Sequence, residues 1–160
     1  MSTHLHDHVT EDETLLLGPP AGETTLDTGD GPVLLVSAGI GITPMAAMLD
    51  LLARIQPTRQ IILAHADRSP AHHAFRRECA QTATGLGEVD ELYWYESGHD
   101  DRSQPGFMDV DALPLPPDTT AYLCGPLPFM HGIRAGLIRR GLAAERIHYE
   151  VFGPGMLDRD

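Results

Sequence analysis

The stretch Pro32 to Leu52, PVLLVSAGIGITPMAAMLDLL, decides the fold of this chain. It opens with four apolar residues at 33–36, a run typical of a strand that is covered on both faces in a parallel sheet. Small residues at 37–43 make a turn. Pro44 suits the first helical position because its missing N–H would have no partner there, so we expect a helix to begin at Pro44. The stretch therefore predicts a strand, a loop and a helix in that order.

The loop between this strand and this helix has the size and composition of a phosphate-binding turn. Gly39 and Gly41 carry no Cβ atom, so backbone amides can approach an anion there, and the next helix adds the positive end of its dipole. A Gly-x-Gly turn also serves as a simple tight turn, and Pro44 stands where the third glycine of a GxGxxG motif would fall. From this loop alone, pyrophosphate binding and a purely structural role both stay open.

Length and composition describe one ordinary globular domain and argue against several partners. The chain has 160 residues, of which 42% are hydrophobic and 21% are charged, as in a folded domain of this size. The formal net charge is −12, so we expect neither nucleic acid nor an anionic membrane as a partner. No apolar run approaches the roughly 18 residues that span a bilayer. Because the polar start is also unlike a signal peptide, we expect a cytoplasmic location.

The cysteines and the first histidines are candidate metal ligands, and we expect no metal site. Cys79 and Cys124 lack metal-ligand spacing and make no disulfide framework, so both are expected to be reduced thiols. His4, His6 and His8 alternate, which on a strand would place three imidazoles on one face. An exposed polar segment is favoured over a metal site there, since no acidic or cysteine ligand is fixed beside them at a zinc-like spacing.

Residues 28–160 alternate predicted strands with predicted helices, whereas residues 1–27 do not. In the longer part we expect strands at 33–36, 60–66, 92–95, 120–123 and 147–152, helices at 44–56, 72–83 and 128–140, a polar loop at 98–106 and a helical turn at 108–113. In the first part we expect only short extended pieces at 15–17 and 24–26. The order of elements predicts an α/β fold with a doubly wound parallel sheet.

Ligands of such a sheet bind outside the carboxyl ends of its strands, where the connections diverge. The loops expected at those ends are 38–43, 67–69, 96–98, 124–128 and 152–155. Two of them, 38–43 and 124–128, contain glycine and lead into helices that start with proline. This repetition favours a dinucleotide-binding site over two unrelated turns.

Three motifs occur in order along the chain: SAGIGITPM at 37–45, YLCGPLPFM at 122–130 and HYEVFGP at 148–154. Together they resemble the pyridine-nucleotide domain of ferredoxin–NADP reductase-type oxidoreductases. Within that superfamily the chain is most similar to the reductase end of flavohaemoproteins, the bacterial nitric oxide dioxygenases. The resemblance implies a ferredoxin reductase-like NAD-binding domain at 28–160, which binds NADH and transfers hydride to FAD.

The resemblance also implies roles for individual residues. Thr43, Cys124 and Glu150 would act at the redox centre, although a small packed residue before a turn is an equally good interpretation of Cys124. Phe152 would face the flavin together with Glu150. The residues implied to bind NAD are Ala38, Gly39, Ile40, Gly41, Ile42, Thr43, Pro44, Cys124, Gly125, Pro126 and Phe129.

Residues 1–27 resemble the last part of an antiparallel FAD-binding barrel. Ser2 and Thr3 fall where the second flavin-phosphate motif of that barrel ends. The upstream flavin motif, most barrel strands and the haem-binding globin domain have no counterpart in the sequence, so the FAD site is expected to be incomplete. We therefore expect an FAD-binding or haem-globin domain to be supplied upstream or in trans.

Coenzyme choice is expected to depend on the loop after the second strand. Asp67 is placed to accept hydrogen bonds from a ribose 2′-hydroxyl and to repel a 2′-phosphate, whereas Arg68 could pair with that phosphate. A solvated turn is the alternative. The acidic chain and the flavohaemoprotein resemblance both favour NADH over NADPH.

Two other functions stay open on the sequence alone. One is a nucleotide-binding module without independent catalysis. The other is a reductase component for a different electron acceptor, because one fold serves many acceptors.

Overall fold

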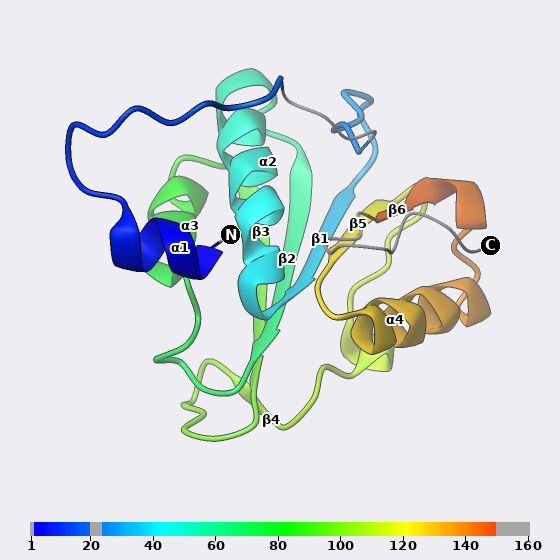
Figure 1. The fold of residues 1–160 in the computed structure, drawn as a ribbon. Helices are drawn as coiled ribbons and strands as arrows, with labels where there is room; N and C mark the ends of the chain where they lie inside the picture. The colour runs from blue at the N-terminus through cyan, green and yellow to red at the C-terminus, as the bar shows by residue number, and fades with distance from the viewer. Residues whose placement is uncertain (1, 20–23, 150–160) are drawn as a thin grey trace.

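The computed structural model describes residues 2–19 and 24–149. Its body is a six-stranded sheet in the order β4-β3-β2-β1-β5-β6, in which every neighbouring pair is parallel (Figure 1). The strands are β1 Val33–Ala38, β2 Gln60–Asp67, β3 Glu88–Tyr95, β4 Gln104–Pro105, β5 Thr120–Cys124 and β6 Ile147–Tyr149. The chain runs from β1 towards one edge and then returns to place β5 on the other side of β1. The doubly wound parallel sheet is therefore confirmed.

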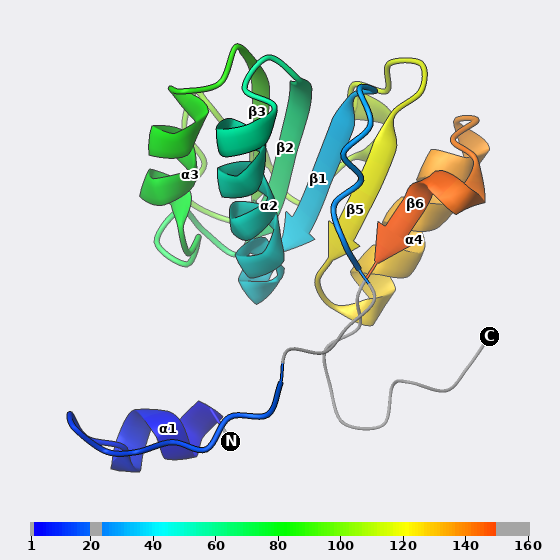
Figure 2. The same ribbon diagram turned by 90° about the horizontal axis from the view of Figure 1, so that it is seen from above.

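Helices cover both faces of this sheet. Helices α2 (Ile42–Ile55) and α3 (Arg76–Ala83) lie on one face, and α4 (Leu127–Arg139) lies on the other (Figure 2). In β1, Leu34 and Val36 pack in the core under α4, while Val33 and Leu35 pack in the core under α2. A strand buried on both faces has no polar side to present, which explains the unbroken apolar run in the sequence.

Short 3₁₀ turns connect these elements. They are η1 Gly39–Gly41, η2 Val110–Ala112 and η3 Ala144–Arg146. The turn η1 leads directly into α2, which begins at Ile42 and not at Pro44 as expected. Pro44 is still in the first turn of the helix, where the absence of its N–H costs nothing.

Three boundaries differ from the expected ones. Helix α3 begins at Arg76, four residues late, because Phe75 has a left-handed backbone (φ 57°) that cannot continue a helix. Strand β3 begins at Glu88, four residues early, because β2 pairs with it along its full length. The expected loop at 98–106 contains the two-residue strand β4, which pairs with the end of β3. Strand β6 covers 147–149, and the rest of the expected strand lies outside the described residues.

The N-terminal segment does not form the expected extended pieces. Residues Ser2–His8 form the helix α1, which lies apart from the α/β body (Figure 2). No strand occurs at 15–17 or at 24–26, because a strand needs a neighbouring strand and the described body offers none there. Because His4, His6 and His8 lie on a helix, the arrangement that a strand would give them, with three imidazoles on one face, does not occur. In the helix, His4 and His8 stack with their ring centroids 5.0 Å apart, as residues four positions apart do.

Two further findings concern the described residues. None of the helices among them is long and apolar enough to cross a membrane. Residues 2–19 and 24–149 also contain no group of three or more His, Cys, Asp or Glu side chains arranged to hold a metal ion.

Candidate functional site

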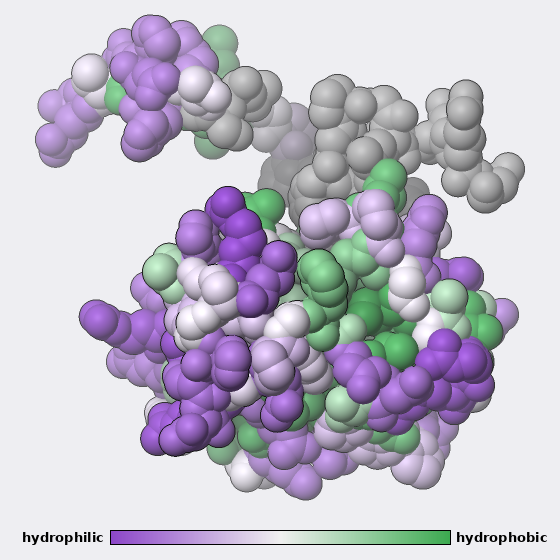
Figure 3. All heavy atoms as spheres, turned by 90° about the horizontal axis from the view of Figure 1, so that it is seen from below, coloured by the Kyte–Doolittle hydropathy of each residue, from purple (hydrophilic) through white to green (hydrophobic). Residues whose placement is uncertain are grey.

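A cleft of about 730 Å³ opens at the carboxyl edge of the sheet. It spans the ends of β1, β2 and β3, the loop at 106–110 and the first turns of α4. Figure 3 faces this edge and shows apolar atoms gathered between polar loops. The connections from β1 and β5 leave the sheet in opposite directions here, which is where open parallel sheets bind ligands. A volume of this size is typical of a cofactor site.

Two glycines let the loops after β1 and β5 approach each other closely. A Cβ atom on Gly41 would lie 2.2 Å from the carbonyl oxygen of Cys124, a distance that no side chain tolerates. A Cβ atom on Gly125 would lie 3.2 Å from the amide nitrogen of Ala38 and 3.0 Å from the Phe129 ring. The two loops are therefore packed backbone against backbone, and together they form the wall of the cleft at the end of β1.

Gly39 and the start of α4 are suited to an anion. Gly39 has a left-handed backbone (φ 54°) and open space around the position of its missing Cβ. Pro126, Pro128 and Phe129, at the beginning of the 13-residue helix α4, also line the cleft. The N-terminus of a helix carries unpaired N–H groups and a partial positive charge. A pyrophosphate lying between Gly39 and α4 would meet both.

The structure brings six of the expected cofactor-binding residues together in the lining of the cleft. They are Ala38, Gly39, Asp67, Arg68, Pro126 and Phe129. Cys124, Gly41 and Ile42 are buried beneath this lining. Ile40 is exposed beside it, and Pro44 belongs to the first turn of α2.

Three of the described residues expected at the redox centre or at the flavin, Thr43, Ser2 and Thr3, do not line the cleft. Thr43 is exposed, and its hydroxyl donates to the carbonyl of Ile40 at 3.1 Å. Ser2 and Thr3 lie on α1, which stands apart from the α/β body (Figure 2) and supplies no residue to the lining of the cleft. Glu150 and Phe152 lie outside the described residues.

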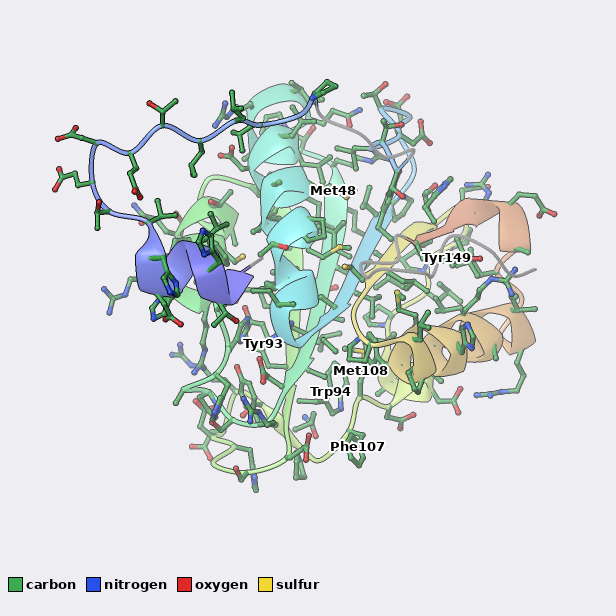
Figure 4. All side chains as sticks on the ribbon, in the orientation of Figure 1. Met48, Tyr93, Trp94, Phe107, Met108 and Tyr149 are labelled. Atoms are coloured by element: carbon green, nitrogen blue, oxygen red, sulfur yellow. The ribbon has the colours of Figure 1, made fainter. Side chains whose placement is uncertain are left out.

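Sequence reasoning missed the wall of the cleft that faces α4. Phe107, Met108 and Val110 supply this wall, and Phe107 is 81% exposed. In Figure 4, Phe107 and Met108 lie near the start of α4. An apolar Phe-Met pair after a long polar loop was the available signal. Glu96 also lines the cleft from a loop that was expected at the carboxyl edge, although the residue itself was not singled out.

Asp67 is held from two sides at the edge of the cleft. One carboxylate oxygen, Oδ1, accepts a hydrogen bond from the amide of Arg68 at 2.7 Å. The other, Oδ2, lies 3.5 Å from Nε2 of His65, a polar contact longer than a good hydrogen bond. The side chain of Asp67 is 8% exposed. Its carboxylate is therefore fixed before any ligand arrives.

Two stacked histidines lie behind Asp67 on the face covered by α2 and α3. The rings of His65 and His73 have centroids 3.9 Å apart, and Nδ1 of His73 lies 2.7 Å from the hydroxyl of Tyr95. Burial lowers the pKa of His65 from 6.5 to about 4, although Asp67 acts in the opposite direction. Burial lowers the pKa of His73 to about 3, and the neighbouring His65, when it is protonated, and the Arg76 guanidinium act in the same direction. Both imidazoles are neutral at pH 7.

Comparison with known proteins identifies the family. The family model described as an oxidoreductase NAD-binding domain matches residues 35–135. The flavohaemoprotein of Bordetella pertussis is 41% identical over 165 residues, a match that covers 97% of this chain and 41% of the relative. The chain thus spans about two fifths of the length of the curated relatives it matches.

Two solved structures are similar to the chain in fold and in sequence. The flavohaem-like FAD/NAD-binding domain of nitric oxide dioxygenase from Vibrio cholerae has a TM-score of 0.89 and 38% identity, covering 96% of this chain and 64% of that one. The flavohaemoglobin of Malassezia yamatoensis, determined with bound FAD and haem, has a TM-score of 0.74 and 34% identity, covering 82% of this chain and 35% of that one. The chain therefore belongs to the oxidoreductase NAD-binding domain family, and it is a module of the type that serves NAD(P)H–flavin oxidoreductases.

Proposed function

We propose that the chain binds NADH in the cleft at the carboxyl edge and presents its nicotinamide to an FAD. The observation that carries this proposal is the close packing of the β1 and β5 loops at Gly41 and Gly125, which builds one continuous wall at the end of β1. NADH brings the hydride and FAD accepts it, so the protein contributes binding and orientation. A rigid wall of backbone is suited to that task.

The proposed pose places each part of the coenzyme against a different set of residues. The pyrophosphate lies between Gly39 and the start of α4. The adenosine lies over the end of β2, near Asp67 and the exposed ring of Phe107. The nicotinamide then points towards the loop that holds Thr43, next to Cys124. The roles at the flavin that the resemblance implies for Glu150 and Phe152 remain proposals.

Preference for NADH over NADPH follows from the charges at the adenosine end. Asp67 and Glu96 both line this part of the cleft, against one guanidinium, that of Arg68. Two carboxylates repel a 2′-phosphate, and a fixed carboxylate accepts hydrogen bonds from a ribose hydroxyl.

The FAD is proposed to be held by a further domain. Residues 2–19 form a short helix and a segment without strands, which cannot close a barrel around a flavin. Ser2 and Thr3 would contribute to the flavin phosphate site only when such a domain is present. By analogy with the flavohaemoprotein relatives, we propose that this domain and a haem-globin domain precede the module. Electrons would then pass from FAD to haem, where nitric oxide and oxygen yield nitrate. The proposed location is the cytoplasm.

A second function is favoured by one observation. The N-terminal helix α1 lies apart from the body, so the chain by itself offers a coenzyme cleft without a flavin cradle in its described part. A nucleotide-binding module without independent catalysis fits this arrangement. A reductase component for another electron acceptor uses the same cleft.

The test is to titrate NADH and NADPH into the wild type, Asp67→Ala and Glu145→Ala. Glu145 is exposed on η3, so its removal changes the net charge equally at a distance from the cleft. We expect the wild type to bind NADH more tightly, Asp67→Ala to lose about tenfold of this preference, and Glu145→Ala to keep it. Tighter binding of NADPH by the wild type would contradict the proposal. Dye reduction by NADH with added FAD separates a reductase from a binding module.

A further inference from the structure

A series of buried polar side chains lies beneath the proposed adenosine end of the cleft. Ser37 and His65 are opposite residues in the pairing of β1 with β2, and both are fully buried. The hydroxyl of Ser37 lies 2.9 Å from Nδ1 of His65, and Nε2 of His65 lies 3.5 Å from Asp67. Ser37, His65 and Asp67 therefore form a series of polar side chains that leads from the middle of the sheet to the carboxylate at its edge.

The chemistry of the three groups assigns the proton on His65. The carboxylate of Asp67 accepts hydrogen bonds and cannot donate them, so the nitrogen that faces it, Nε2, carries the hydrogen. Nδ1 then accepts the hydrogen of the Ser37 hydroxyl. This tautomer aims an N–H dipole at Asp67 without adding a positive charge, which agrees with the neutral state of the buried imidazole.

The ring of His65 has little freedom to turn. His73 stacks on it at 3.9 Å, and His73 is itself fixed by the hydroxyl of Tyr95 at 2.7 Å. Among the described residues, Nε2 of His65 makes no hydrogen bond, and it lies 3.5 Å from Oδ2 of Asp67. Its orientation towards Asp67 is therefore set by the packing and by Ser37.

We propose that His65 is a positioning residue for coenzyme discrimination, which holds the Asp67 carboxylate in the orientation that meets the ribose of NADH. Since Oδ1 is held by the Arg68 amide and Oδ2 by His65, binding a ribose hydroxyl costs no rotamer freedom at Asp67. The inference rests on the proposed binding of NADH. It assigns His65 an effect on the ribose end alone.

A double-mutant cycle tests this coupling. Dissociation constants for NADH and NADPH are measured for the wild type, His65→Leu, Asp67→Asn and the double variant. We expect His65→Leu to weaken NADH binding about threefold to tenfold, because the Asp67 carboxylate loses its fixed orientation and must be ordered on binding. Binding of NADPH should change less than about twofold. In the Asp67→Asn background the His65 substitution should have no further effect on the preference.

A parallel cycle with Glu96→Gln is the matched control, because Glu96 also lines the cleft but follows β3 and not β2. The effect of Glu96→Gln on the preference for NADH should add to the effect of His65→Leu. His65→Gln, which keeps an N–H donor, should recover part of the preference, and Ser37→Ala should lose part of it. If His65→Leu does not fold, the cycle with Ser37→Ala and His65→Gln decides the question in its place.

The outcomes separate this inference from the proposed function. A wild type that does not prefer NADH overturns the proposed function and the inference with it. A wild type that prefers NADH, with His65 variants that weaken both coenzymes equally or act equally in the Asp67→Asn background, overturns the inference alone.

Discussion

His65 and His73 are buried histidines whose second ring nitrogens find no hydrogen-bond partner among the described residues. Because charging either ring in this site is unfavourable, the folded protein keeps both neutral while the unfolded chain does not. Each pKa lies well below 6.5 in the folded state, at about 4 for His65 and about 3 for His73. As the pH falls below 6.5, the unfolded chain therefore binds more protons than the folded protein.

We expect the contribution of the two neutral histidines to the free energy of unfolding to be complete above pH 6.5 and to decrease as the pH falls towards 4. Each histidine contributes up to about 1.4 kcal/mol per pH unit in that window. Urea unfolding at a series of pH values measures the slope. His73→Phe should reduce it, while His72→Ala, at the neighbouring exposed histidine, should keep it. An unchanged slope in His73→Phe would show that the His73 imidazole is not responsible.

The loop that contains Gly39 and Gly41 was predictable from the sequence, but its contacts with the rest of the protein were not. The sequence predicted that Gly39 and Gly41 form a tight loop, and the structure has that loop. The close approach of Gly41 to the carbonyl of Cys124 could not be predicted, because it joins residues more than eighty positions apart. The burial of Asp67 against His65 was hidden for a related reason, since it depends on how the edge of the sheet is packed.

At the scale of elements, the contact between α4 and η2 shapes the cleft. Arg139 on α4 makes two hydrogen bonds to Asp111, at 2.8 and 3.0 Å, and Arg140 donates to the carbonyls of Val110 and Leu113. Val110 lines the cleft and packs against the core under α4. The position of η2, and with it one wall of the site, depends on how closely α4 approaches.

Gly136 and Gly132, one turn apart on α4, make a matched pair for this contact. A Cβ on Gly136 would lie 2.5 Å from a methyl group of Val110, whereas a Cβ on Gly132 would meet nothing within 4 Å. We expect Gly136→Ala to lower the free energy of unfolding by about 1–3 kcal/mol through overpacking. Gly132→Ala should raise it by about 0.5–1 kcal/mol, because alanine is the better helix former. Urea unfolding of both variants checks this.

If Gly136→Ala were as stable as the wild type, η2 would be free to move away from α4, and the proposed wall would not be rigid. NADH binding offers a second readout, since displacement of Val110 should weaken it.

Elements such as α4 were predictable because their apolar spacing and their Pro and Gly boundaries are local. The left-handed backbone of Phe75, which delays α3, and the pairing of β4 with β3 were not, because no residue pattern of this kind marks them.

At the scale of the whole molecule, the body and the N-terminal segment differ in their contacts. The body holds the chain from residue 24 onwards: Leu26 packs against the core under α2, the amide of Asp27 donates to the Tyr122 hydroxyl at 2.6 Å, and Arg59 donates to the carbonyl of Asp27 at 2.6 Å. The doubly wound layout of this body was predicted from the alternation of elements. The strands predicted in the N-terminal segment were wrong, since the sequence pattern contains no information on whether a partner strand is present.

Removal of residues 1–23 should therefore leave the body intact and change its self-association. Leu16 and Leu17 are 99% and 87% exposed, and adjoining exposed apolar side chains favour association between copies. We expect the shortened chain to unfold within about 0.5 kcal/mol of the full chain, to bind NADH equally, and to elute from a sizing column as a smaller species at high concentration. Removal of residues 1–31 is the contrasting variant, because it also deletes Leu26 and the Asp27 contacts and should destabilise the body. Equal elution of the full and the shortened chain would show that these leucines do not drive association.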